Sequence, residues 1–364
     1  MTIKELCNQL EDWAPTANAE DFDNVGLLVG DATAEITNVL VAHDALENVV
    51  AEAVSKDCNV IVCFHPIIFS GLKSLTGKNY VERAVLKAIK NDIAIYAIHT
   101  ALDNVQHGVN LGMCNALGIE NPKILIPKSG TIQKLVTYVP HASAKGVSQA
   151  LFTAGAGQVG NYDECSFSVA GSGTFRASEK ANPVIGEKGK QHTEPETQLN
   201  ITFEKRFQSQ ILKALFTNHP YEEVAYEITN LENKNQNLGM GMVGLLPEAL
   251  SEDEFLSLIK NKFKTGGVRH SALLGKSIQK VAVLGGSGAF AIKAAKGNGA
   301  DAYVTADLKY HDYYQAENNI LLADVGHYES ERHTKNIIAD YLIEKNRSFA
   351  VILSQENTNP INYF

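Results

Sequence analysis

The chain has 364 residues, of which 45% are hydrophobic and 20% charged, a balance typical of a globular protein with more than one domain. Its net charge of −9, without a Lys/Arg stripe, argues against nucleic acid as the main partner. No apolar run approaches the roughly 18 residues of a membrane span. Acidic residues near the start are unlike a secretion signal, so we expect a cytoplasmic protein that does not enter a membrane.

The first third of the chain alternates apolar strands with helices. We expect strands at residues 26–29, 37–42, 59–64 and 93–98, and helices at residues 3–12, 46–55 and 80–90. Continuous runs rich in Val and Ile, separated by helical periods, favour a mostly parallel sheet that is covered on both faces.

The middle of the chain has a different pattern. Strands are predicted at residues 134–140, 165–171, 198–204 and 224–230, and helices at 144–154 and 207–218. This βαββαβ order is typical of a ferredoxin-like α+β domain. Residues 173–197 are rich in Gly, Pro, Lys and Glu and predict a long exposed loop or arm. We therefore expect an inserted domain over residues 128–245.

The α/β rhythm returns in the last part of the chain. Strands are predicted at residues 280–284, 302–305 and 320–324, and helices at 289–296, 310–317 and 327–344. The sequence thus predicts one α/β domain with mostly parallel sheets, divided into a first half, residues 1–127, and a second half, residues 246–364.

Two polar segments follow neighbouring strands of the first half. His65 comes directly after an apolar strand, and Pro66 holds it in an extended conformation. His99 ends the next strand, and Asp103 lies four residues further on. Open α/β sheets bind ligands at the carboxyl ends of their strands, so both segments are expected to face one crevice.

A third segment adds an imidazole and a carboxylate. His327 and Glu331 stand at i and i+4 of a predicted helix, so they share one face, and the preceding strand places them at the same sheet edge. Taken singly, strand-end histidines are more often structural, and helical His/Glu pairs are more often solvated surface pairs. The convergence of His65, Asp103, His327 and Glu331 is what indicates a divalent-metal site.

Weaker signals lie nearby. His311, in the segment after the strand at 302–305, is a candidate proton shuttle, although a plain loop leading into a helix explains the segment equally well. His43 and Asp44 follow the strand at 37–42 and could also line the site. Residues 285–288, Gly-Gly-Ser-Gly, suit either a phosphate-holding turn or a simple tight turn.

With these residues in view, the chain resembles the Nif-three-like family of GTP cyclohydrolase 1 type 2 homologs nearly from end to end. The resemblance rests on ordered motifs, among them residues 21–31 (DFDNVGLLVGD), 65–69 (HPIIF), 99–103 (HTALD), 285–288 (GGSG), 326–331 (GHYESE) and 357–360 (NTNP). The PII/CutA-like insert of the longer family members is resembled by residues 155–157 (GAG), 160–163 (GNYD), 173–175 (GTF) and 219–223 (HPYEE).

The resemblance implies two metal ions. One would lie on His65, Asp103 and Glu331, and the other on His327 and Glu331, with the glutamate bridging. In the family a pair of adjacent histidines precedes the proline, but the first of these positions is Phe64 here. Phenylalanine cannot bind a metal, so the second ion loses a ligand that water or a side chain such as His43 or His311 would have to replace. The sequence does not distinguish Zn, Fe, Mn and Mg.

The resemblance also implies a two-lobed α/β fold and ring-shaped homo-oligomers, commonly hexamers. The function that it implies is a metal-dependent hydrolase of a nucleotide-like or other small polar substrate. The alternative is a non-catalytic metal-binding protein, acting as a regulator, chaperone or adaptor, whose PII-like insert senses a small molecule.

Overall fold

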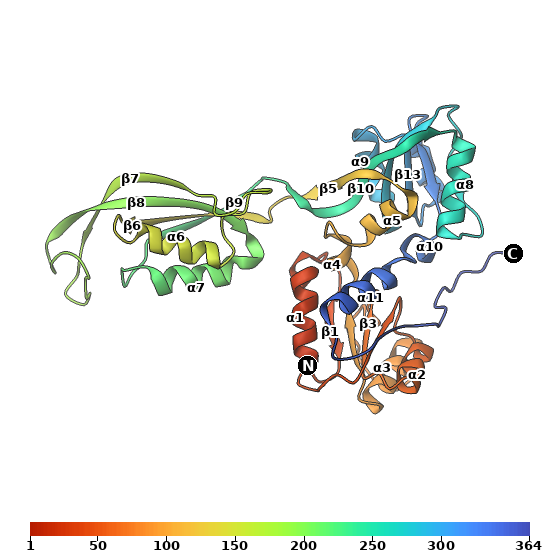
Figure 1. The fold of residues 1–364 in the computed structure, drawn as a ribbon, viewed down its shortest axis with the longest axis horizontal. Helices are drawn as coiled ribbons and strands as arrows, with labels where there is room; N and C mark the ends of the chain where they lie inside the picture. The colour runs from red at the N-terminus through yellow and green to blue at the C-terminus, as the bar shows by residue number, and fades with distance from the viewer. The chain divides into compact units, whose positions relative to one another are not determined.

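The computed structural model describes residues 1–364, which divide into two compact units. The larger unit combines Met1–Pro127 with Gln236–Phe364, and the smaller is Lys128–Asn235 (Figure 1). The predicted insert boundary at residue 245 is therefore corrected. That residue lies inside strand β10 (Asn235–Leu250), which pairs with strand β12 (Ile278–Ser287) of the larger unit.

The first sheet of the larger unit has five strands in the order β1-β4-β3-β2-β15. Neighbouring strands run parallel from β4 to β15, and β1 is antiparallel at the edge. The strands are β1 (Gly26–Val29), β2 (Val39–Ala42), β3 (Val60–Cys63), β4 (Ala94–Ala97) and β15 (Val351–Leu353). This sheet and the helices packed against it form the first lobe. The helices are α1 (Ile3–Trp13), α2 (Glu47–Ser55), α3 (Tyr80–Lys90) and α11 (Thr334–Lys345).

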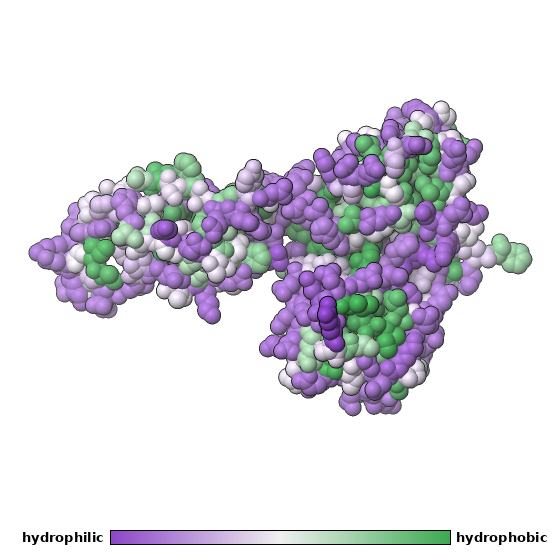
Figure 2. Space-filling view, viewed as in Figure 1, coloured by the Kyte–Doolittle hydropathy of each residue, from purple (hydrophilic) through white to green (hydrophobic).

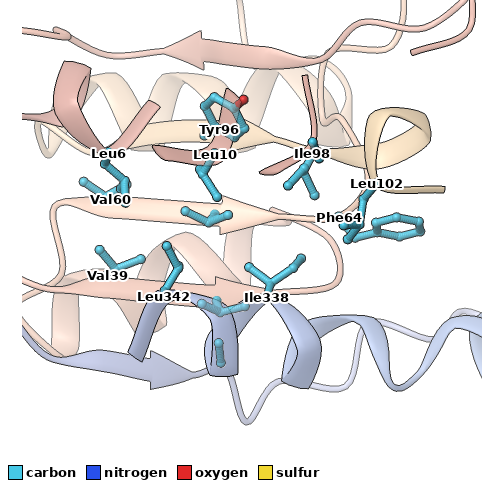
Figure 3. Close-up of a cluster of buried hydrophobic side chains, with 14 of the residues drawn as sticks. Leu6, Leu10, Val39, Val60, Phe64, Tyr96, Ile98, Leu102, Ile338 and Leu342 are labelled. Carbon is cyan, nitrogen blue, oxygen red and sulfur yellow. The ribbon is translucent and has the colours of Figure 1, made fainter. Parts of the chain in front are cut away.

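Both faces of this sheet are buried, which explains the uninterrupted apolar runs. Val60 points into one core with Leu6 of α1 and Ile338 of α11 (Figure 3), and Val62 belongs to the same core. Ile61 points the other way, into the core that contains residues of α2 and α3. Because side chains alternate along a strand, a strand that is covered on both faces needs apolar residues at every position.

The second sheet has six strands in the order β11-β14-β13-β12-β10-β5. Its central strands β12, β13 and β14 are parallel, while β10 pairs antiparallel with β12 and β11 pairs antiparallel with β14. The strands not yet introduced are β5 (Glu120–Lys128), β11 (Arg269–His270), β13 (Ala302–Ala306) and β14 (Leu321–Asp324). The first sheet is therefore mostly parallel, as expected, whereas the second is mixed, because its pairs are parallel only at β12–β13 and β13–β14.

The remaining elements of the larger unit are helices of both the α and the 3-10 type. They are η1 (Thr16–Asn18), α4 (His99–Asp103), α5 (Val109–Leu117), α8 (Glu252–Phe263), η3 (Ala289–Ala291), α9 (Ile292–Gly297), η4 (Tyr310–Ala316) and α10 (His327–Glu331).

The last part of the chain differs from the prediction in two ways. The single helix expected over residues 327–344 is two helices, α10 and α11. After this break α11 packs on the first sheet, and β15 pairs with β2. Residues 246–364 therefore complete both lobes rather than the second alone.

The smaller unit has the element order βαββαβ. Its elements are β6 (Ile132–Pro140), α6 (Ala144–Thr153), β7 (Phe167–Arg176), β8 (Gln191–Glu204), η2 (Lys205–Phe207), α7 (Gln208–Asn218) and β9 (Tyr226–Leu231). All neighbours in the sheet order β7-β8-β6-β9 are antiparallel. The predicted loop over residues 173–197 is shorter than expected, because β7 extends to Arg176 and β8 begins at Gln191.

Hydrophilic residues cover much of the visible surface, with apolar residues gathered in patches (Figure 2). None of the helices combines the length and the apolar character that crossing a bilayer requires.

Candidate metal centre

The candidate ligands follow strands of both sheets of the larger unit. His43 follows β2, His65 comes two residues after β3, and Asp103 ends the short helix α4 that follows β4. His327 and Glu331 are the first and last residues of α10, just after β14. The carboxyl ends of parallel strands from two sheets therefore supply side chains to one place.

Glu331 is the centre of the cluster. Its Oε2 lies 3.3 Å from Nε2 of His65, 3.3 Å from Nε2 of His327 and 3.5 Å from Nε2 of His43. The side chain is only 3% exposed, and this oxygen has no geometrically satisfactory hydrogen bond. Metal bonds of about 2.0–2.2 Å place neighbouring ligands of a tetrahedral ion about 3.3–3.6 Å apart. The observed spacings fit a divalent ion better than they fit hydrogen bonds.

Carboxylates orient two of the three imidazoles. His65 Nδ1 lies 2.8 Å from Oδ1 of Asp44, and His327 Nδ1 lies 2.7 Å from Oδ2 of Asp307. With Nδ1 donating its proton to the carboxylate, the lone pair on Nε2 is directed at Glu331, the arrangement found for metal-binding histidines. Asp307 has a left-handed backbone with φ of 56° and also accepts a hydrogen bond from the Ser287 hydroxyl.

The pKa values show that the cluster attracts positive charge. Burial alone would lower the pKa of His65 and His327, but their hydrogen bonds to carboxylates raise it to about 9 and about 11 respectively. Burial raises the pKa of the Glu331 carboxyl, yet the three imidazoles outweigh this and hold it well below its usual range. A bound cation would take the place of the protons that these imidazoles otherwise carry.

Asp103 interacts electrostatically with this cluster but is not part of its tightest group. Burial, followed by the negative charge of Glu331, raises its pKa well above the usual value, and its Oδ1 has no hydrogen-bond partner. The ligand atoms of His65, His327 and Glu331 all lie within 4.8 Å of one another, and Asp103 is not in this group. Three of the four predicted ligands are therefore brought together, and Asp103 is coupled to them electrostatically.

His311, the predicted proton shuttle, lies elsewhere. Its side chain is exposed, and its ring contacts are to Tyr310 and Tyr314. His99 is likewise engaged outside the group, since its Nδ1 lies 2.8 Å from Oδ1 of Asp23.

Three residues outside the four predicted ligands contribute to the cluster: His43 and Asp44, which the sequence indicated only weakly, and Asp307. His43 directs Nε2 at Glu331, while Asp44 and Asp307 orient the imidazoles of His65 and His327. The available signal was their position directly after strands β2 and β13. That signal shows which sheet edge a residue occupies but not which atoms meet there.

The Gly-Gly-Ser-Gly turn packs against the cluster. The backbone N–H of Gly285 donates to Asn110 Oδ1, and that of Gly286 donates to Ser330 Oγ. Gly286 has φ of 68°, and a Cβ there would collide with the Glu331 carboxylate. These two N–H groups are already used, so the turn serves to admit α10 closely rather than to hold a phosphate.

A cavity of about 1130 Å³ opens beside the cluster. His65 and His327 form part of its wall, together with Asp44 and Asp307. Side chains of α3 and of the C-terminal segment complete it, among them Arg83, Lys87, Asn359 and Tyr363. The volume is sufficient for a nucleotide-sized molecule.

The fold and the cluster together define an α/β protein with one mostly parallel and one mixed sheet, an inserted antiparallel unit, and candidate metal ligands at the strand ends. The chain belongs to the Duf34/NIF3 (NGG1p interacting factor 3) family, whose sequence model matches residues 1–360. This confirms the resemblance that the motifs indicated.

Similar proteins match along their whole length. A GTP cyclohydrolase 1 type 2 homolog of Bacillus subtilis is 35% identical, covering 99% of this chain and 98% of the relative. A solved structure of a Bacillus cereus protein related to NIF3 is 35% identical with a TM-score of 0.86, covering 100% of this chain and 99% of that one. A Staphylococcus aureus structure is 28% identical with a TM-score of 0.80, over the same shares of the two chains.

Proposed function

We propose that this chain binds a divalent metal ion through His65, His327 and Glu331, and that it is a metal-dependent hydrolase of a small polar, nucleotide-like substrate. The observation that carries the proposal is the convergence of imidazole Nε2 atoms on the buried Glu331 Oε2, at 3.3 to 3.5 Å. Asp103 is proposed as a further ligand, since its buried Oδ1 has no other partner.

A bound divalent ion would supply a water with a pKa of about 7 and would polarise the bond to be broken. The chain's own residues prepare the site for this. Asp44 and Asp307 hold the Nδ1 protons of His65 and His327, which keeps both Nε2 atoms available. The adjoining cavity admits the substrate beside these two imidazoles. His311 does not line the cavity, so we assign it no proton transfer within a single chain.

GTP is the first substrate to test, because the curated relatives carry the name GTP cyclohydrolase 1 type 2 homolog. The purified chain, reconstituted separately with Zn²⁺, Mn²⁺ and Fe²⁺, should open or hydrolyse GTP or a related nucleotide, and Glu331→Gln should not. Absence of turnover with every metal and nucleotide, while the metal is bound, would contradict the hydrolase proposal.

The second candidate is a non-catalytic metal-binding regulator, chaperone or adaptor. The observation that favours it is Phe64, which is fully buried in the first core and cannot serve as a ligand for a second catalytic ion. In this case metal or a small molecule would change the assembly or recruit a partner without turnover. Turnover that a chelator abolishes would contradict this candidate.

The smaller unit is proposed to be a PII/CutA-like ferredoxin-like module, on the basis of its βαββαβ order and the strand order β7-β8-β6-β9. We further propose a homo-oligomer, with a hexamer as the expected state, in the cytoplasm. Light scattering coupled to size-exclusion chromatography should give a mass near six times 39.5 kDa. A monomer at micromolar concentration would contradict this part of the proposal.

A further inference from the structure

His43 is a buried imidazole without a hydrogen-bond partner. It is 5% exposed, and neither Nδ1 nor Nε2 forms a hydrogen bond. Its Nε2 lies 3.5 Å from Oε2 of Glu331, and its ligand atom lies within 4.8 Å of those of Asp44 and His65. A buried polar group without a hydrogen-bond partner costs stability. The His43 imidazole therefore calls for a bound partner that is not part of the protein.

The sheet register explains how His43 reaches this place. Strands β2 and β3 are parallel, and Ala42 pairs with Cys63 as the last residues of the two strands. The pairing continues one step beyond, because the N–H of His65 donates to the carbonyl of His43 at 3.0 Å. His43 and Phe64 are therefore next to each other across the two strand ends.

The two side chains also point to the same face. Val41 and Val62, two residues before each of them, lie in the same core as Phe64 itself. Side chains alternate along a strand, so residues 43 and 64 share this face, and their rings lie 5.6 Å apart between centroids. A ligand carried by either strand end would enter the cluster from the same side.

We propose that His43 Nε2 is a metal ligand beside Glu331, and that it supplies from β2 the imidazole that Phe64 cannot supply from β3. The inference rests on the metal site of the proposed function and assigns it a ligand that the family motif does not include. A borderline-soft divalent ion such as Zn²⁺ suits a ligand set of three imidazoles completed by carboxylate oxygens. No carboxylate orients His43 through Nδ1, unlike His65 and His327, so His43 is the least firmly held imidazole of the set.

The test compares Zn²⁺ binding by the full-length wild type, His43→Leu, and the double variant His43→Leu/Phe64→His. Zn²⁺ affinity is measured by competition with a chromophoric chelator, and melting temperature is measured in excess EDTA. His219→Leu is the matched control, because His219 is also buried but lies in the smaller unit and bonds the Tyr138 carbonyl.

We expect His43→Leu to weaken Zn²⁺ binding by at least about tenfold, since removing even an orienting partner of a ligand costs ten- to a hundredfold. Its melting temperature in EDTA should not fall, because the change removes an unpaired buried polar group. The double variant should recover most of the affinity, and His219→Leu should bind Zn²⁺ as the wild type does.

Unchanged Zn²⁺ affinity in His43→Leu would overturn the inference and leave the proposed metal site standing. A lower melting temperature of His43→Leu in EDTA would also overturn it if the loss of stability accounted for the weaker Zn²⁺ binding. His43 would then have a structural role. If the double variant did not recover Zn²⁺ affinity, a histidine at position 64 could not replace His43. That result would overturn the inference that His43 supplies the imidazole missing from the end of β3. A wild type that binds no Zn²⁺, Mn²⁺ or Fe²⁺ would overturn the proposed function itself, a result that the other outcomes cannot imitate.

Discussion

Glu331 combines deep burial with a carboxylate oxygen surrounded by imidazoles. Burying a charge is costly unless it is paired, and here the possible counter-charges are protonated imidazoles or a cation. The long Nε2–Oε2 distances and the absence of satisfactory hydrogen bonds at Oε2 favour the cation. Metal binding is therefore expected to affect the residues around Glu331 more strongly than substitutions in the surrounding core do.

The carboxylates that orient the imidazoles provide the first prediction. Asp44→Asn and Asp307→Asn should each weaken divalent-metal binding by about 10- to 100-fold without unfolding the chain, because His65 or His327 loses its oriented tautomer. Competition with a chromophoric chelator measures the affinity, and circular dichroism checks the fold. Asp31→Asn, which alters an exposed turn with Thr33, is the control. Wild-type affinity in both orienting variants would contradict the arrangement.

Metal affinity should also depend steeply on pH. In the metal-free protein the pKa of His65 is raised to about 9 and that of His327 to about 11, so both are protonated at neutral pH. Metal must displace these protons, and apparent affinity should rise by about tenfold per pH unit for each proton displaced. The rise should lessen above about pH 9, where His65 is already neutral. Affinity that is flat between pH 6 and 8.5, measured by calorimetry, would contradict this account.

At the scale of one element, the start of α3 carries a carboxylate that ties down the loop before it. Glu82 is 2% exposed and accepts hydrogen bonds from the backbone N–H groups of Thr76 and Lys78 and from the Asn79 side chain. These bonds, led by that from Thr76, lower its pKa from 4.5 to about 2. The loop-to-helix junction is thus held by the ionised form.

The third prediction follows from the sign of this shift. A pKa that is lower in the folded state stabilises the protein above the unfolded value, and the contribution is lost as pH falls from about 4.5 toward 2. Glu82→Gln should therefore be less stable than the wild type at pH 7, and the difference should shrink below pH 4. Urea unfolding at several pH values measures it, with the exposed Glu232→Gln as control. A difference independent of pH would show that ionisation is not the cause.

Sequence patterns predicted the elements better than their connections. The strands at β2, β3, β4, β13 and β14 were predictable because each is a short apolar run that is buried on both faces. The break between α10 and α11 was not, because the residues between them continue a helical pattern, and packing on a different sheet decides where the second helix goes.

The candidate site was predicted to a similar extent. His65, His327 and Glu331 were found because strand ends and an i, i+4 pair are visible in sequence. His43 needed the β2–β3 register, and His311 misled because its position after β13 says nothing about the direction of its side chain. Periodicity gives the face of an element, whereas distances between ligand atoms depend on how two sheets meet.

At the scale of the whole molecule, the chain is interleaved rather than divided in sequence. The smaller unit leaves the larger one after β5 and returns at β10, two strands that are neighbours in the second sheet. It has its own core, with buried residues such as Leu135, Leu151 and Ile211. All candidate ligands lie in the larger unit.

The fourth prediction is that the metal centre does not need the smaller unit. Replacing residues 128–235 by a short Gly/Ser linker between Pro127 and Gln236 should leave metal affinity within about threefold of the wild type, because β5 and β10 keep the linker ends close. Metal titration of the shortened chain checks this. A folded shortened chain without metal binding would assign part of the centre to the smaller unit.

Glu331 is proposed as the common ligand of a divalent-metal centre. The most direct measurement is metal analysis by inductively coupled plasma mass spectrometry of wild type and Glu331→Gln, purified without chelator and equilibrated with Zn²⁺. The wild type should hold at least one tightly bound ion per chain and Glu331→Gln none, because the amide cannot supply the buried negative charge. Equal metal content in the two proteins would contradict it.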